Sequence, residues 1–90
     1  MKLHIEWLQS ALDELSKIWT EAPSSVRKAI TAASHDIDKH LPNRPDEQGE
    51  SRPDGRRIAF FPPLGITYRV EVQSSVVIVI HVWRFHQHGE

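Results

Sequence analysis

Two strand-like segments joined by a very short connection constrain the fold of this chain more than any other feature. In residues 66–72, apolar side chains occupy every second position, which predicts a strand with one buried face. Residues 76–82 are almost all apolar, which indicates a strand covered on both faces. Ser74 and Ser75 lie in the short turn between them. Such a turn can join antiparallel strands, whereas parallel strands need a long crossover, so we predict an antiparallel hairpin.

Two further segments extend this pattern. Arg57 to Phe61 forms a short strand-like run that ends at Pro62 and Pro63, so residues 57–86 are predicted to form an antiparallel meander. At the other end of the chain, residues 1–7 alternate apolar and polar side chains, which predicts a short opening strand.

Residues 8–41 show a helical period instead. Apolar side chains recur at spacings of three and four on both sides of Pro23, which ends one helix. A serine after Pro23 would cap the next helix, and Pro42 would stop it. Because the connection is short, the two helices should form an antiparallel hairpin. The predicted fold class is α+β, with this N-terminal helical hairpin packed on a small antiparallel β-sheet.

The domain organisation follows from length. The chain has 90 residues, so residues 1–90 are predicted to form one domain. Residues 42–56 are polar and rich in Pro and Gly, which indicates a long loop between the helices and the meander.

Composition limits the function classes. There is no cysteine, so neither disulfides nor thiolate metal sites are expected. No segment has the run of about 20 apolar residues that a membrane span needs, so we expect a cytoplasmic protein without a membrane partner. Residues 1–50 carry six Lys or Arg and nine Asp or Glu, whereas residues 51–90 carry five Arg, no Lys and three Asp or Glu. The strand half is therefore mildly basic, which is a weak nucleic-acid signal.

Several short segments, taken in order, resemble the RelE/ParE toxins of bacterial type II toxin–antitoxin modules, and the resemblance covers nearly the whole chain. The segments that carry it are Ile5-Glu6-Trp7 with Ala11 and Leu15, Ile18-Trp19, Ile37-Asp38 with Leu41, Gly49-Glu50-Ser51-Arg52, Arg57-Ile58 with Phe60, Pro63-Leu64-Gly65-Ile66, Tyr68-Arg69-Val70 and Val82-Trp83-Arg84.

The resemblance implies two helices packed on a small antiparallel sheet, and a cognate antitoxin that neutralises the chain. It implies one of two activities. RelE-like members bind the ribosome and cleave mRNA without a metal, which inhibits translation, whereas ParE-like members act on DNA gyrase. We favour the RelE-like activity and keep the gyrase inhibitor, and a toxin-like binding module without activity, as alternatives.

Metal-independent RNA cleavage needs a base, an acid and cations that stabilise the phosphate. In a continued strand, Arg84, His86 and His88 would project on one side, with Trp83 and Phe85 on the other. We expect Arg84 to hold phosphate and His86 or His88 to act as acid or base. The predicted catalytic residues are Arg57, Arg84, His86 and His88, and the predicted RNA-binding residues are Arg52, Arg56 and Arg69.

These side chains also have structural interpretations. Arg52, Arg56 and Arg57 could be solvated charges or ion pairs that hold the loop, and Arg69 could pair with Glu71 on the polar face of its strand. Tyr68 alternates inward and fits a core residue. RelE-like enzymes usually carry an arginine just before the central strand, where this chain has Gly65, and the strand half has no lysine. These departures keep the alternatives open.

No metal or cofactor is expected. His86 and His88 have His-x-His spacing, but no third ligand is evident, and metal sites normally need three or four. The expected partners are the antitoxin and either ribosome-bound mRNA or gyrase. A free edge strand could also pair with a second copy of the chain, giving a homodimer, or with the antitoxin, giving a hetero-oligomer.

Overall fold

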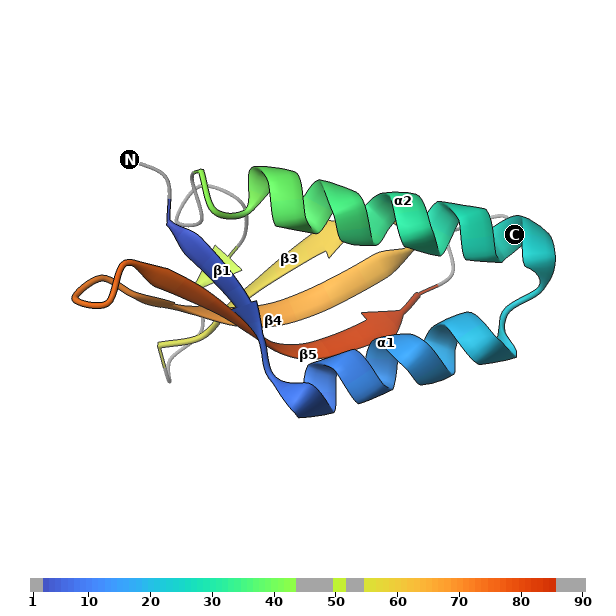
Figure 1. Ribbon diagram of the computed structural model, residues 1–90, viewed down its shortest axis with the longest axis horizontal. Helices are drawn as coiled ribbons and strands as arrows, with labels where there is room; N and C mark the ends of the chain where they lie inside the picture. The colour runs from blue at the N-terminus through green and yellow to red at the C-terminus, as the bar shows by residue number, and fades with distance from the viewer. Residues whose placement is uncertain (1–2, 44–49, 52–54, 86–90) are drawn as a thin grey trace.

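The computed structural model describes residues 3–43, 50–51 and 55–85 of the chain, and Figure 1 shows their arrangement. In these residues, two helices and five strands follow one another in an order that matches the predicted strand, helical hairpin and meander. They are β1 (His4–Trp7), α1 (Gln9–Glu21), α2 (Ser24–His40), β2 (Glu50–Ser51), β3 (Arg57–Phe61), β4 (Leu64–Glu71) and β5 (Val76–Arg84).

The five strands form one sheet in the order β1-β5-β4-β3-β2. From β2 to β5 each pairing is antiparallel, which confirms the predicted meander. The sheet as a whole is mixed, because β1 pairs with β5 in parallel. Most of the chain separates these two strands, so the connection is long enough for the crossover that a parallel pairing requires. The loop predicted over 42–56 contains β2, a strand of two residues.

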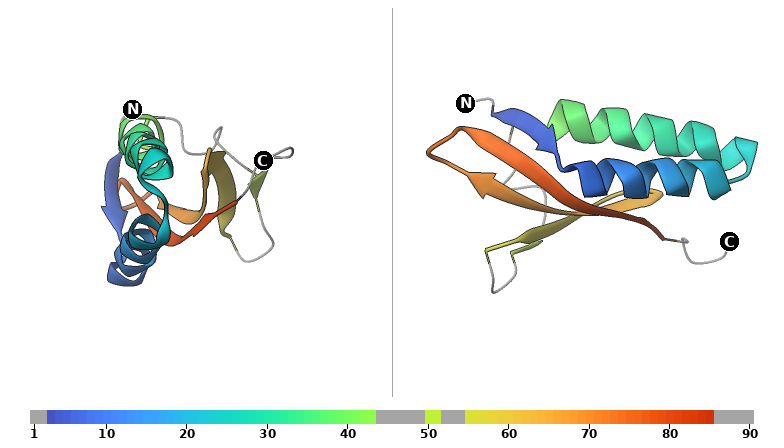
Figure 2. Two further views of the ribbon diagram at one scale, coloured as in Figure 1. Left: turned by 90° about the vertical axis from the view of Figure 1, so that its right-hand side faces the viewer. Right: turned by 60° about the horizontal axis from the view of Figure 1, so that its bottom comes forward.

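Both helices lie on one side of the sheet (Figure 2). Helix α1 packs along β5, while α2 contacts β3 and β4. In each helix, the apolar residues at spacings of three and four lie on the face that points toward the sheet. The core forms where these faces meet the side chains of the sheet that point toward the helices. This core contains Ala11, Ile30, Ala33 and Ile37 from the helices, and Ala59, Leu64, Ile66, Tyr68, Val77, Val79 and Val82 from the strands.

The junction between the helices differs from the sequence prediction in one detail. Pro23, rather than a serine, is the N-cap residue of α2, and no side chain caps this end. The Pro23 carbonyl instead accepts hydrogen bonds from the backbone N–H groups of Val26 and Arg27. The serine prediction was wrong because Pro23 already has the extended conformation of an N-cap and Ser24 is the first helical residue.

Arg27 fastens the two helices together. Helix α1 has no basic residue in its last turn, and its final carbonyl groups need donors. The Arg27 guanidinium donates to the carbonyl oxygens of Trp19 and Thr20, each at 2.9 Å. It also lies 4.5 Å from the centre of the Trp19 ring, a cation–π contact. A side chain of α2 therefore caps the C-terminus of α1.

A β-bulge decides which side chains of β5 face the helices. Thr67 lies opposite His81 and Tyr68 lies opposite Val79, so Ile80 is an extra residue in β5. Alternation restarts after Ile80, which returns Val82 to the core side, where it is buried. Before the bulge, the consecutive residues Val76 and Val77 are both buried, as the predicted two-sided coverage of this strand requires.

The face of the sheet opposite the helices carries a cross-strand row of three residues. Phe60 of β3, Gly65 of β4 and Trp83 of β5 lie directly opposite one another. A Cβ atom at Gly65 would come within 2.5–2.6 Å of the Trp83 ring. The indole therefore occupies the space that a side chain at Gly65 would need.

We predict that Gly65→Ala lowers the free energy of unfolding by about 1–3 kcal/mol, because the added methyl group displaces the indole. Urea unfolding followed by far-UV circular dichroism measures this. The double variant Gly65→Ala, Trp83→Leu should lose less than the two single losses combined, and strict additivity would contradict the proposed packing.

Arg27→Ala should lower the free energy of unfolding by about 1–3 kcal/mol, because two helix-terminal carbonyl groups lose a charged donor. The neighbouring exposed cation provides a matched control, and Lys28→Ala should change stability by less than about 0.5 kcal/mol. Equal urea midpoints for the two variants would show that Arg27 does not hold the hairpin.

Candidate functional site

Arg84, at the end of β5, lies on the helix-facing side of the sheet. It is paired in register with Leu64, which is fully buried, and Arg84 itself is half-buried. Its Nε atom is shielded from solvent and has no hydrogen-bond partner within residues 3–43, 50–51 and 55–85. An unpaired buried donor costs roughly 1–3 kcal/mol, so this guanidinium is placed to gain from an incoming anion. Trp83 and Phe85 lie on the other side of the sheet from Arg84, as strand alternation predicted.

Arg57, on β3, faces the same side as Arg84 but lies far from it. The Arg57 Nε–H donates to the Tyr68 hydroxyl at 3.3 Å, and the two residues are register partners. Arg84 is instead opposite Leu64, four residues away along β4. At the rise of a strand this is about 13 Å. The structure therefore does not bring the two predicted catalytic arginines together, and Tyr68 is a buried core residue, as predicted.

Arg69 lies on the opposite face of β4, because its neighbours Tyr68 and Val70 point toward the core. Its guanidinium is 2.9 Å from the Glu71 carboxylate, which confirms the expected pairing, and both side chains are about half exposed. Arg56 is half-buried just before β3 and has an interaction partner of its own. Among the other predicted site residues, Arg52, His86 and His88 lie outside the described part of the chain.

Glu14 of α1 caps the edge of β5 beyond the end of β1. Its Oε1 accepts a hydrogen bond from the backbone N–H of Val82 at 3.0 Å, and its Oε2 lies 3.6 Å from His81 Nδ1. Helix α1 thereby continues the cover that β1 gives to the first half of β5.

An aromatic cluster lies on the face away from the helices, and the sequence reasoning did not identify it as a surface. Phe60 contacts Trp83 and Phe85 edge to face, with ring centres 6.4 Å and 5.3 Å apart. Phe60 is 60% exposed. The signal was present in the sequence, because Trp83 and Phe85 share one strand face, but their pairing with Phe60 depends on the strand register.

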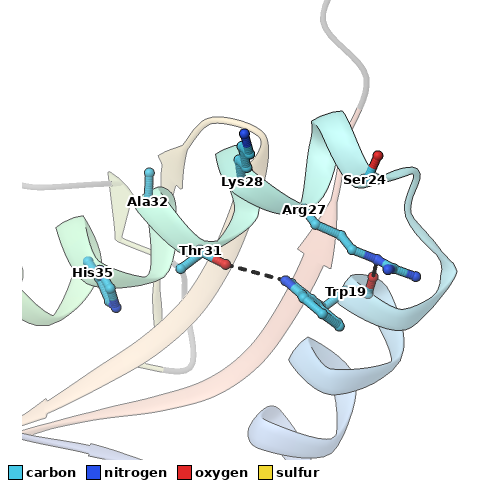
Figure 3. A pocket seen from close by; sticks show the side chains of 7 residues that line it. All are labelled: Trp19, Ser24, Arg27, Lys28, Thr31, Ala32 and His35. Carbon is cyan, nitrogen blue, oxygen red and sulfur yellow. Dashed lines mark hydrogen bonds between the residues drawn. The ribbon is translucent and has the colours of Figure 1, made fainter.

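The outer surface of the helical hairpin carries an open groove, shown in Figure 3. One part has a volume of about 580 Å³ and a neighbouring part about 280 Å³, and both are lined by Trp19 and Thr31. The Trp19 indole donates to the Thr31 hydroxyl at 3.3 Å. Arg27, Lys28 and His35 line the larger part, and none of the described residues that line it carries a carboxylate. The groove is therefore partly apolar with a basic rim.

Two classes of site receive no support from the described residues. Within residues 3–43, 50–51 and 55–85, no group of three or more His, Asp or Glu side chains could hold a metal ion. Over the same residues, none of the helices has the length and apolar character to cross a membrane.

Comparison with solved structures finds the same arrangement of helices and strands in proteins of toxin–antitoxin systems. The structure is similar to the RelBE2 toxin–antitoxin complex of Mycobacterium tuberculosis, with 18% identity, 94% of this chain and 100% of the other covered, and a TM-score of 0.74. It is similar to the chromosomal ParDE system of P. aeruginosa, with 17% identity, 94% and 98% covered, and a TM-score of 0.73. The isolated E. coli RelE toxin is 18% identical over 97% and 88% of the chains, with a TM-score of 0.54.

At the level of sequence, no protein-family profile and no curated protein matches the chain. The similarity thus lies in the three-dimensional arrangement, a helical hairpin on one side of a small mixed sheet. The chain has the RelE/ParE fold.

Proposed function

We propose that this chain is the toxin of a type II toxin–antitoxin module, that a cognate antitoxin neutralises it, and that the free toxin cleaves mRNA on the ribosome without a metal. The observation that carries the toxin assignment is the fold. The similarity extends over 94% of this chain and over 100% of the matching chain in the RelBE2 toxin–antitoxin complex. The proposal that mRNA is the target depends on the arginines of the described residues and on the groups around them.

Arg84 supports a phosphate-binding role. A guanidinium presents donors in a planar fork that matches the geometry of phosphate oxygens. Among the described residues, the buried Nε of Arg84 has no acceptor, and an RNA phosphate would supply one. The N-terminal half of the chain is acidic, whereas the half that contains Arg84 carries more arginine than acid.

In the proposed reaction, Arg84 holds the scissile phosphate at the end of β5. His86 or His88 removes the proton from the ribose 2′-hydroxyl, and the 2′-oxygen forms a bond to phosphorus. The bond from phosphorus to the 5′-oxygen breaks, and an acid protonates that oxygen, leaving a cyclic phosphate. Arg57 lies about 13 Å along the sheet and would contact a neighbouring phosphate, as would Arg52 and Arg56.

The antitoxin would occupy the groove between the helices. Trp19 and Ala32 give this groove apolar surface, and Arg27, Lys28 and His35 also line it. An amphipathic helix with acidic side chains beside its apolar anchors matches that combination. Such a partner would also cover the exposed side chains of Leu12 and Trp19.

A second candidate function is inhibition of DNA gyrase. The register keeps Arg57 and Arg84 apart, and Arg69 is paired with Glu71, so the described cations form no cluster around one phosphate. A toxin that acts only by binding needs no acid–base cluster. The similarity to the ParDE system of P. aeruginosa is consistent with this alternative.

Expression of the full chain alone from an inducible promoter in bacteria tests the toxin assignment. We expect growth arrest that co-expression of the cognate antitoxin relieves. Unimpaired growth at a verified protein level would contradict both toxic functions and favour a binding module without activity.

Arg84→Ala should reduce mRNA cleavage by about 100-fold or more, because a donor to the transition-state phosphate is lost. Primer extension on mRNA from arrested cells measures the cuts. Lys17→Ala, an exposed cation of α1, is the matched control and should cleave normally. Growth arrest without mRNA cuts, together with trapped gyrase–DNA complexes, would exclude the nuclease and support the second candidate.

A further inference from the structure

The last residues of β5 lie beyond the reach of its partner strand on one side. Strand β1 pairs with β5 only from Val76 to Val79, and Leu8, which follows β1, donates its backbone N–H to the Val79 carbonyl at 3.0 Å. Among the described residues, no strand lies along this edge of β5 after Val79. Arg84 is at the far end of that stretch, so its position depends on whatever else covers the edge.

Helix α1, which runs beside the second half of β5 (Figure 1), supplies this cover through Glu14. The Oε1 atom of Glu14 accepts a hydrogen bond from the backbone N–H of Val82 at 3.0 Å, and Oε2 lies 3.6 Å from His81 Nδ1. A hydrogen bond to a carboxylate is stronger than one to a neutral acceptor. The helix therefore grips the edge of β5 at a point between the end of the β1 pairing and Arg84.

The end of β5 is also held from the β4 side. The backbone N–H of Phe85 donates to the Pro63 carbonyl at 3.0 Å, and Arg84 lies in register with Leu64. Val82 and Arg84 point to the same face of the sheet, at a spacing of about 7 Å along the strand. Because only one residue separates them, a displacement of the backbone at Val82 also turns the Arg84 side chain.

The direction of the Arg84 side chain matters because of its Nε atom. This donor is shielded from solvent and has no hydrogen-bond partner among the described residues. No acceptor in that part of the chain fixes Nε directly, so the backbone of β5 has to aim it. A donor that stabilises a reacting phosphate is effective only when it is already aimed at the place where charge develops.

From these contacts we propose that Glu14 is a positioning residue for Arg84. By holding the Val82 N–H, the carboxylate fixes the end of β5 and thereby the direction in which the Arg84 Nε–H meets a phosphate. In this role Glu14 contacts neither the phosphate nor the ribose and acts only through the strand. The inference rests on the phosphate-binding role of Arg84 in the proposed function.

Hydrogen exchange of the purified, ¹⁵N-labelled full chain, followed by NMR, tests the positioning. Glu14→Ala should speed the exchange of both the Val82 amide and the Arg84 Nε–H by about 5- to 10-fold, the effect of one lost hydrogen bond. Glu14→Gln keeps a carbonyl oxygen that can accept the Val82 N–H, so both rates should stay within about 2-fold of those of the unmodified chain.

Two controls separate positioning from general destabilisation. The Arg27 Nε–H donates to the Trp19 carbonyl near the C-terminal end of α1, and its exchange rate should not change in Glu14→Ala. Glu21→Ala makes the same change at an exposed position of the same helix and should leave the Val82 and Arg84 rates unaltered.

Faster exchange at Val82 alone, with the Arg84 Nε–H unchanged, would overturn the proposal, because Glu14 would then only cover the edge. Equal acceleration at Arg27 would overturn it in favour of a general structural role. Glu14→Gln rates equal to those of Glu14→Ala would do the same, since the acceptor oxygen would not be what holds the strand.

Primer extension on mRNA from arrested cells then links the positioning to the reaction. Glu14→Ala should reduce the cuts by about 5- to 10-fold, and Glu14→Gln should restore them. Unchanged cleavage by Glu14→Ala, in a chain that cleaves, would refute the positioning role. A chain that makes no cuts at all refutes the nuclease function instead, and the exchange rates of Val82 and Arg84 still decide whether Glu14 positions the guanidinium.

Discussion

The antiparallel ladder between β4 and β5 is the interaction on which the rest of the structure depends. It fixes which side chains reach the helices and which reach the opposite face, and one bulge at Ile80 sets the phase of its second half. Without that extra residue, strict alternation from Val79 would turn His81 and Trp83 toward the core and Val82 and Arg84 away from it. The bulge thus places an apolar side chain in the core and a guanidinium beside it.

The two faces of the sheet consequently differ in chemistry. The helix-facing side combines the core with half-buried arginines, one bonded to Tyr68 and one with an unpaired Nε. The opposite face has the exposed Phe60 ring, the half-buried rings of Trp83 and Phe85, and an ion pair between Arg69 and Glu71.

The sequence predicted the elements better than their pairings. Apolar spacing located both helices and the β4–β5 hairpin because these signals are local. The parallel pairing of β1 was not predictable, since partners distant in sequence leave no trace in a strand of four residues. In the candidate site, the pairing of Arg69 with Glu71 and the burial of Tyr68 followed from alternation. The distance between Arg57 and Arg84 did not, because it depends on strand register, and the face of Arg84 depends on the bulge.

Because Glu14 bonds to the edge of β5, the two edges of the sheet differ in how well they are covered. Strand β1 covers the first half of that edge, and α1 fills the second half, with the Val82 N–H already bonded. On the other side, β2 pairs only with Arg57 and Ile58. Among the described residues, the remainder of β3 from Ala59 to Phe61 has no strand beside it on that side. In the described part of the chain, the edge of the sheet is therefore covered along β5 and less covered along β3.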